Sequence, residues 1–262
     1  MAHVPDAILL IGPTGSGKTP LGDRLAADGL AGRPCRHFDF GAQLRRIAAG
    51  DRPPGEMTPE DVTFIRSVLA TGALLEDEHF PVAERILRTF LAERPGAPEE
   101  RGMDTVPTGR QVLPARPGAG PAPEPESTAK MAVRRTGETP VPRSGGDLIV
   151  LNGLPRHVGQ AKDIERILHV LAVIELACPP EVVLARIRTN AGGDRGRRDD
   201  DGDDLIRRKL ATYAARTAPL LAHYRRLAVP IYRLTVAAAT TAEQLRADLA
   251  RRGVGVRRGP AR

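Results

Sequence analysis

The sequence has few aromatic side chains and few cysteines, and both shortages limit what the protein can be. Its 262 residues include three Tyr, five Phe and no Trp, so the core must be aliphatic, and a surface that stacks bases on aromatic rings is disfavoured. The two cysteines, Cys35 and Cys178, are far apart and belong to no CxxC pair, which excludes a disulfide scaffold. A reducing, cytoplasmic compartment is therefore expected.

Long apolar runs and metal-ligand patterns are also missing from the sequence. No segment approaches the ~18 apolar residues of a membrane span, and the apolar run at 7–11 is too short for a secretion signal, so no membrane partner is expected. The six histidines have no metal-ligand spacing. The formal charge of +7 suits a polyanionic partner, either a nucleotide or a nucleic acid. The basic tail, 253–262, is interpreted as a solvated end, so nucleic-acid binding is not expected.

A segment rich in proline and glycine interrupts the chain at about 95–146. Its 52 residues hold ten of the 24 Pro and eight of the 27 Gly, and no apolar period survives in them. Such a composition buries too little apolar surface to offset the entropy of ordering. We therefore expect a disordered surface insertion, which leaves about 210 residues for the folded part.

Strand and helix patterns alternate through the remaining residues. The expected strands are 7–11, 35–39, 147–151, 172–176 and 230–234. Helices are expected at 18–28, 41–49, from Thr58 onward, 77–93, 160–169, 180–188, 203–227 and 241–251. This alternation predicts an α/β fold, with a parallel five-stranded sheet between two layers of helices.

Residues 12–19 (GPTGSGKT) match the phosphate-loop pattern GxxxxGK[ST] in full, directly after the first strand and at the start of a helix. The glycines let backbone N–H groups surround a phosphate, and the helix N-terminus adds a favourable dipole. Lys18 is expected to reach the β- and γ-phosphates, and the Thr19 hydroxyl to ligate Mg²⁺. The predicted ATP-binding residues in this loop are Gly12, Gly15, Ser16, Gly17, Lys18 and Thr19.

Three further blocks follow in order. They are FGAQLR at 40–45, NGLPR at 152–156 with Gln160, and GRRDD at 196–200, and a TAPL stretch with Tyr224 comes after them. Together with the phosphate loop they resemble adenylate kinase and its nucleoside-monophosphate kinase relatives, whose blocks read TGDxLR, DGFPRxxxQA and GRxDD. The resemblance implies a single P-loop kinase domain over 1–262, with a helical region that binds the nucleoside monophosphate at about 40–94 and a short lid at about 189–201. It also implies the reaction ATP + AMP = 2 ADP, with Mg²⁺.

The resemblance assigns roles to individual residues. Arg45 and Arg156 would hold the acceptor phosphate, and Gln160 would bind the acceptor base. The implied catalytic residues are Lys18, Arg156, Arg197 and Arg208. The implied monophosphate-binding residues are Phe40, Arg45, Leu75, Gly153, Arg156 and Gln160. Arg197 would also contact ATP, and Asp199 and Asp200 would close the lid. An offset of one residue leaves Lys209 as an alternative to Arg208, and it keeps Arg198 as a candidate.

Phosphoryl transfer itself requires two anions in line and cations that neutralise their spreading charge, which favours the same residues. Three positions depart from the family pattern. Asn152 stands where the family has Asp, so metal handling is expected to weaken, and Phe40 and Ala42 replace Thr and Asp beside the acceptor. Two alternatives therefore stay open: a kinase of another nucleotide or small acceptor, and a catalytically weak nucleotide-binding regulatory protein. A monomer is expected.

Overall fold

The computed structural model describes residues 4–51, 57–71, 77–93, 146–194 and 202–254. The chain divides into two compact units, Met1–Glu93 with Arg143–Arg262, and Arg94–Pro142. All described residues belong to the first unit. The predicted insertion, apart from Gly146, lies outside the described residues, as do Leu75, Arg197 and the acidic pair of the lid.

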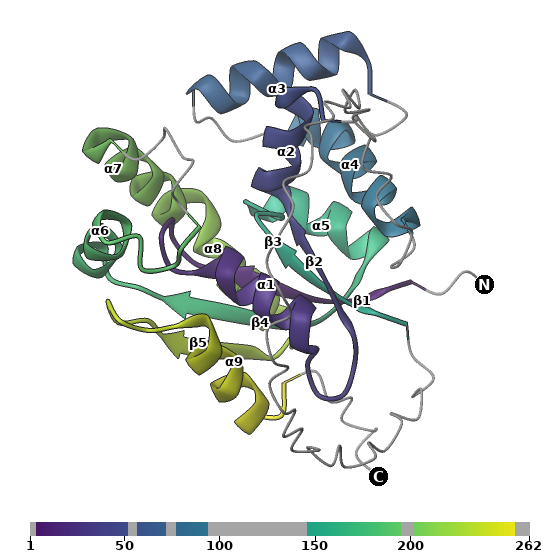
Figure 1. The fold of residues 1–262 in the computed structure, drawn as a ribbon. Helices are drawn as coiled ribbons and strands as arrows, with labels where there is room; N and C mark the ends of the chain where they lie inside the picture. Colours follow the sequence, from purple (N-terminus) through teal and green to yellow (C-terminus); the bar gives the residue numbers. More distant parts are fainter. Residues whose placement is uncertain (1–3, 52–56, 72–76, 94–145, 195–201, 255–262) are drawn as a thin grey trace, which may run out of the picture. The chain divides into compact units, whose positions relative to one another are not determined.

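The described part of the chain has a parallel sheet with the strand order β2-β3-β1-β4-β5 (Figure 1). Its strands are β1 (Asp6–Ile11), β2 (Cys35–Asp39), β3 (Leu148–Asn152), β4 (His169–Ala177) and β5 (Ile231–Thr235). Each strand predicted from the sequence is present, within three residues at either end. Because all strands are parallel, their carboxyl ends meet at one edge of the sheet, where ligands bind in open α/β sheets.

Helices cover both faces of the sheet. They are α1 (Lys18–Asp28), α2 (Phe40–Ala49), α3 (Pro59–Thr71), α4 (Phe80–Ala92), α5 (Val158–Ile167), α6 (Pro180–Arg188), α7 (Asp203–Thr212), α8 (Pro219–Arg226) and α9 (Ala242–Arg251). The predicted α/β fold of the P-loop kinase type is confirmed by this arrangement.

The two faces form separate apolar cores, which the alternation of side chains along β1 explains. Ile8 and Leu10 point to the face covered by α1 and α9, where they pack with Leu21 and Leu245. Ala7, Leu9 and Ile11 point to the other face, where side chains from α2, α4, α5 and α8 pack against the sheet. A strand buried on both faces reads as a continuous apolar run, which is why 7–11 shows no alternation.

The long helix expected over 203–227 is interrupted in the structure. Between α7 and α8, residues Tyr213–Thr217 form a π-helical segment, and Pro219 begins α8. Proline lacks the N–H that would continue the helical ladder, so the interruption follows from this residue. The segment matters because it faces the pocket described below.

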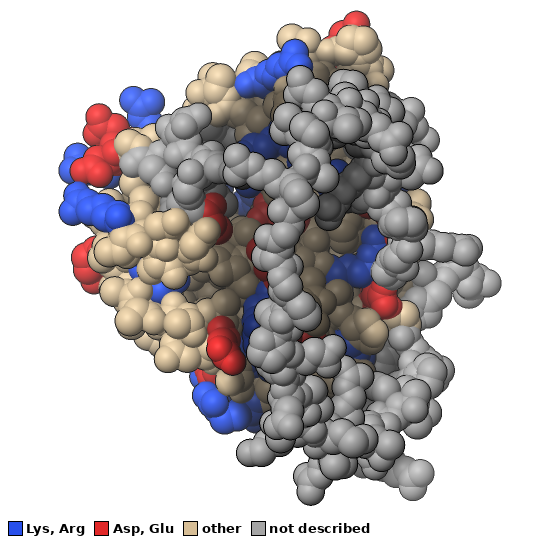
Figure 2. Space-filling view, viewed as in Figure 1, with Lys and Arg blue, Asp and Glu red and all other residues tan. Residues whose placement is uncertain are grey.

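Charges of both signs are mixed over α6 and α7 (Figure 2). Arg188 pairs with Asp203 at 3.4 Å, and Arg207 lies 3.8 Å from Asp204. No helix among the described residues is long and apolar enough to span a membrane.

Candidate functional site

The phosphate loop joins β1 to α1. Gly17 has a φ of 91°, which glycine adopts without steric cost. The Nζ of Lys18 donates to the carbonyl oxygens of Gly12 (2.8 Å) and Pro13 (2.7 Å), so the ammonium group lies over the loop. Ser16 is buried beneath it.

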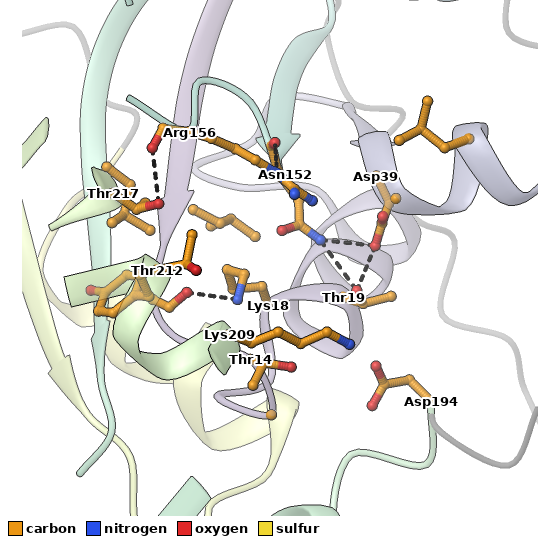
Figure 3. Close-up of a pocket in the computed structure, with 18 of the residues that line it drawn as sticks. Thr14, Lys18, Thr19, Asp39, Asn152, Arg156, Asp194, Lys209, Thr212 and Thr217 are labelled. Carbon is orange, nitrogen blue, oxygen red and sulfur yellow. Dashed lines mark hydrogen bonds between the residues drawn. The ribbon is translucent and has the colours of Figure 1, made fainter. Parts of the chain in front are cut away.

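A pocket of about 250 Å³ opens at this loop (Figure 3). One wall is the phosphate loop itself, and the start of α2 with part of α3 forms the second. The turn after β3 forms the third, and α7 with the π-helical segment forms the fourth. The polar and charged residues among those that line it are Thr14, Lys18, Thr19, Asp39, Arg45, Asn152, Arg156, Asp194, Lys209, Thr212, Tyr213 and Thr217.

At the floor of the pocket, Asp39 joins Thr19 to Asn152. Asp39 and Asn152 end β2 and β3 and are paired in register, which brings their side chains together. Asp39 Oδ2 accepts from Thr19 Oγ1 at 2.5 Å and from Asn152 Nδ2 at 2.9 Å. Its Oδ1 accepts from the backbone N–H of Ala42 at 2.9 Å and so caps α2. Asp39 is the functional candidate that the sequence analysis missed.

Asp39 is held in its charged form. Burial raises the pKa of this carboxyl, but the hydrogen bonds from Thr19 and Ala42, together with the electrostatic effects of the nearby His37 and Arg45, outweigh burial and lower it. A carboxylate and a hydroxyl are the hard oxygen ligands that Mg²⁺ prefers, so this part of the pocket fits the ion expected with a nucleoside triphosphate. The predicted metal residue Thr19 therefore has an anionic neighbour despite the neutral amide at Asn152.

Arg156 is fixed by the turn after β3. Its Nε donates to Gly153 O at 3.1 Å, and its own carbonyl oxygen accepts from Thr217 Oγ1 at 2.9 Å. Burial lowers the pKa of the guanidinium, and the charge of Asp39 opposes that effect. Gly153 has a φ of 86°, and a Cβ there would lie 3.3 Å from the Cβ of Phe40, so only glycine fits without strain.

The structure separates the two candidates on α7. Lys209 lines the pocket and points into it from α7 (Figure 3), whereas Arg208 is exposed and is not among the described lining residues. Lys209, which the sequence analysis kept as an alternative to Arg208, is thus the residue that lines the pocket. The reason is helical geometry: neighbouring residues on a helix differ in direction by about 100°.

Two predicted acceptor residues have other contacts. Gln160 is fully buried, and its Oε1 accepts from the backbone N–H of Arg156 at 2.9 Å, which holds the turn after β3. The ring of Phe40 is fully buried in the core beside Phe38. Among the described residues, neither lines the pocket, whereas Gly41 and Arg45 of the same helix do. Their roles as acceptor-binding residues stay predictions.

Arg186 of α6 connects the phosphate loop to the turn between β5 and α9. This guanidinium is 3% exposed and donates to Gly15 O at 3.0 Å. It also donates to the carbonyl oxygens of Ala237, Ala238 and Thr240, at 2.9–3.0 Å. The sequence analysis did not find it, because a lone arginine on a helix carries no motif.

Several proteins named adenylate kinase match part of the chain. Those of Synechococcus sp. (strain JA-2-3B'a(2-13)) and Parvibaculum lavamentivorans are 38% and 35% identical over 80 and 82 residues, and that of Mycobacterium tuberculosis (strain ATCC 25177 / H37Ra) is 40% identical over 81. Each match covers 29% of this chain, and the chain spans only 40–41% of the length of these relatives. No protein-family model matches the chain.

A solved structure, a gluconokinase from Sinorhizobium meliloti 1021, aligns over 96% of this chain and 95% of its own, with 15% identity and a TM-score of 0.46. At that level the similarity adds nothing about the substrate. The parallel sheet, the phosphate loop at the end of β1 and the partial matches agree with one another. This chain is therefore an α/β protein with a P-loop kinase-like fold, part of whose sequence is similar to that of adenylate kinases.

Proposed function

We propose that the protein is a nucleotide kinase that transfers the γ-phosphoryl group of ATP to the phosphate of a nucleoside monophosphate, with AMP as the first candidate. The observation that carries this proposal is that cations from separate elements line one pocket. They are Lys18 of the phosphate loop, Arg45 of α2, Arg156 after β3 and Lys209 of α7. An in-line transfer between two anions needs this distribution of charge.

The donor side of the pocket is the phosphate loop. Backbone N–H groups at the start of α1 and the ammonium of Lys18 suit the β- and γ-phosphates. The carbonyl groups of Gly12 and Pro13 now accept from Lys18 and would yield it to the nucleotide. Thr19 and Asp39 would hold Mg²⁺, which neutralises charge on the β- and γ-phosphates when it is bound.

The acceptor side is the part of the pocket between α2 and the turn after β3. Arg45 and Arg156 face it from two elements, and guanidinium groups bind phosphate oxygens in a bidentate manner. In the transfer, an oxygen of the acceptor phosphate attacks the γ-phosphorus. The bond to the β,γ-bridging oxygen then breaks, so that ATP leaves as ADP and the monophosphate becomes a diphosphate. Lys209 would neutralise the charge that spreads over the moving phosphoryl group.

A coupled assay with ATP and each nucleoside monophosphate tests this proposal. We expect turnover with at least one monophosphate, highest with AMP, and loss of turnover in Lys18→Ala. Arg45→Ala should raise the KM for the monophosphate, while Arg46→Ala serves as the matched control, because Arg46 is exposed on the same helix and does not line the pocket. Tight ATP binding without turnover on any acceptor would contradict the proposal and favour a regulatory nucleotide-binding protein.

A kinase of a hydroxyl acceptor is the second candidate, and the carboxylate of Asp39 favours it. A hydroxyl nucleophile must lose its proton, and a positioned carboxylate can accept it, whereas an ionised phosphate needs no such base. Turnover with polyols or sugar acids, and with no monophosphate, would support this candidate over the first.

A further inference from the structure

The residue at the end of β3 cannot supply a negative charge in this protein. Asn152 is 4% exposed, and its amide Nδ2 donates to Asp39 Oδ2 and, at 3.2 Å, to Thr19 Oγ1. A side chain that donates to the Thr19 hydroxyl presents its positive end to the place where the metal is expected. The charge that a divalent cation requires must therefore come from a neighbouring residue.

Two carboxylates line the pocket in the described part of the chain, Asp39 and Asp194. Asp194 follows α6 and lines the pocket together with Lys209. Asp39 accepts a hydrogen bond from the Thr19 hydroxyl. Strand pairing places Asp39 beside Asn152, because β2 and β3 are parallel and in register at their last residues.

Asp39 is also held rigidly, as a ligand-supporting group should be. One carboxylate oxygen caps α2 through Ala42, which leaves the other directed at Thr19 and Asn152. The carboxylate thus has a fixed orientation before any ligand enters. Positive charges at Lys18 and Arg156 line the same pocket, so removing the Asp39 carboxylate would leave one acidic side chain, Asp194, among the described lining residues.

We propose that β2 supplies the metal-site carboxylate of this protein, at Asp39, and that Asn152 at the end of β3 orients it through an N–H donor. This inference rests on the proposed function, since the metal enters with the nucleotide. It predicts that the site needs one carboxylate at either of the two strand ends. Moving the carboxylate from position 39 to position 152 should therefore preserve metal binding.

The test measures ATP affinity by calorimetry with and without Mg²⁺, and Mn²⁺ binding to the protein–ATP complex by electron paramagnetic resonance. Asp39→Asn removes the charge but retains a good helix cap. We expect metal-free ATP to bind Asp39→Asn at least as well as the wild type, and Mn²⁺ affinity to fall about 10–100-fold. In the double variant Asp39→Asn with Asn152→Asp, which moves the carboxylate to β3, we expect most of the Mn²⁺ affinity to return.

Two controls keep the result interpretable. Asp39→Ser also keeps a capping side chain and should reproduce the loss of Mn²⁺ affinity if Asp39→Asn folds poorly. Asp23→Asn is the matched charge control, because Asp23 is 68% exposed one turn after Thr19 on α1 and pairs with His37. It should leave Mn²⁺ affinity unchanged.

Unchanged Mn²⁺ affinity in both Asp39 variants would overturn this inference while leaving the proposed function intact. If Asp39→Asn loses turnover but keeps wild-type Mn²⁺ affinity, this inference is overturned as well, and the result favours the hydroxyl-acceptor kinase, in which Asp39 would act as the base. Failure of the wild-type protein to bind ATP would overturn the proposed function and this inference together.

Discussion

At the scale of single residues, the direction of a side chain on its helix decides which cation lines the pocket. Lys209 lines the pocket and Arg208 is exposed, although the two are adjacent in the sequence. The block pattern located this stretch but not the residue, because a shift of one position is invisible in a run of Arg and Lys. Helical phase, which the structure supplies, was the missing information.

Substitutions at the two positions test this assignment. We expect Lys209→Ala to lower kcat by about 10²-fold or more, because a cation on the transferring group stabilises the transition state. Arg208→Ala is the matched control, with the same loss of charge one residue away, and it should retain nearly full activity. The reverse order of effects in steady-state kinetics would return the role to Arg208.

Asp39 shows a second limit of sequence reasoning at this scale. The strand 35–39 was predicted with its correct bounds, yet Asp39 received no role, because the expected metal carboxylate was sought at Asn152 alone. Strand order decides the matter: β2 and β3 are neighbours, although they lie more than a hundred residues apart in the chain. Local patterns carry no information on which strands pair, so this partnership could not be predicted.

At the scale of elements, the contact between α1 and β2 explains an otherwise unfavourable residue. Gly22 lies inside α1, where glycine costs about 0.5–1 kcal/mol relative to alanine. A Cβ at this position would lie 2.2 Å from Nε2 of His37, whose ring is buried and held by Asp23 at 2.8 Å. The close approach of the two elements requires a residue without a side chain.

This geometry predicts the sign of a stability change. Helix propensity alone would make Gly22→Ala stabilising, whereas the clash with His37 should make it destabilising by about 1–3 kcal/mol. Urea unfolding of the variant measures the difference. The loss should shrink in the double variant Gly22→Ala with His37→Ala, measured against His37→Ala alone. Stabilisation by Gly22→Ala in the wild-type background would show that α1 and β2 are less closely packed.

Element boundaries were predicted well where a local signal marks them. Thr241 caps α9 in a full capping box with Gln244, and Pro59 begins α3. The boundary within 203–227 was missed, because the apolar pattern continues across Pro219 and a π-helical segment has no sequence signature of its own. This missed segment contributes Tyr213 and Thr217 to the pocket wall.

At the scale of the whole molecule, the pocket brings together segments that are distant in the sequence. The phosphate loop lines one part of the pocket, and Arg45 of α2 and Arg156 of the turn after β3 line another. The alternation of strands and helices was sufficient to predict this class of fold. The ordered sequence blocks were sufficient to identify three of the cationic residues that line the pocket, Lys18, Arg45 and Arg156. The positions at 72–76 and 195–201, with Leu75 and Arg197, lie outside the described residues, so their predicted roles stay predictions.

The central claim is that two phosphate-bearing ligands bind this one pocket in line. Titration calorimetry with a bisubstrate mimic, two adenosines joined by five phosphates, tests it most directly. We expect one molecule to bind per chain, far more tightly than ATP, and Arg45→Ala or Arg156→Ala to weaken the mimic about tenfold or more while ATP affinity stays nearly unchanged. Binding of the mimic no tighter than ATP, with no effect of either arginine, would contradict the claim.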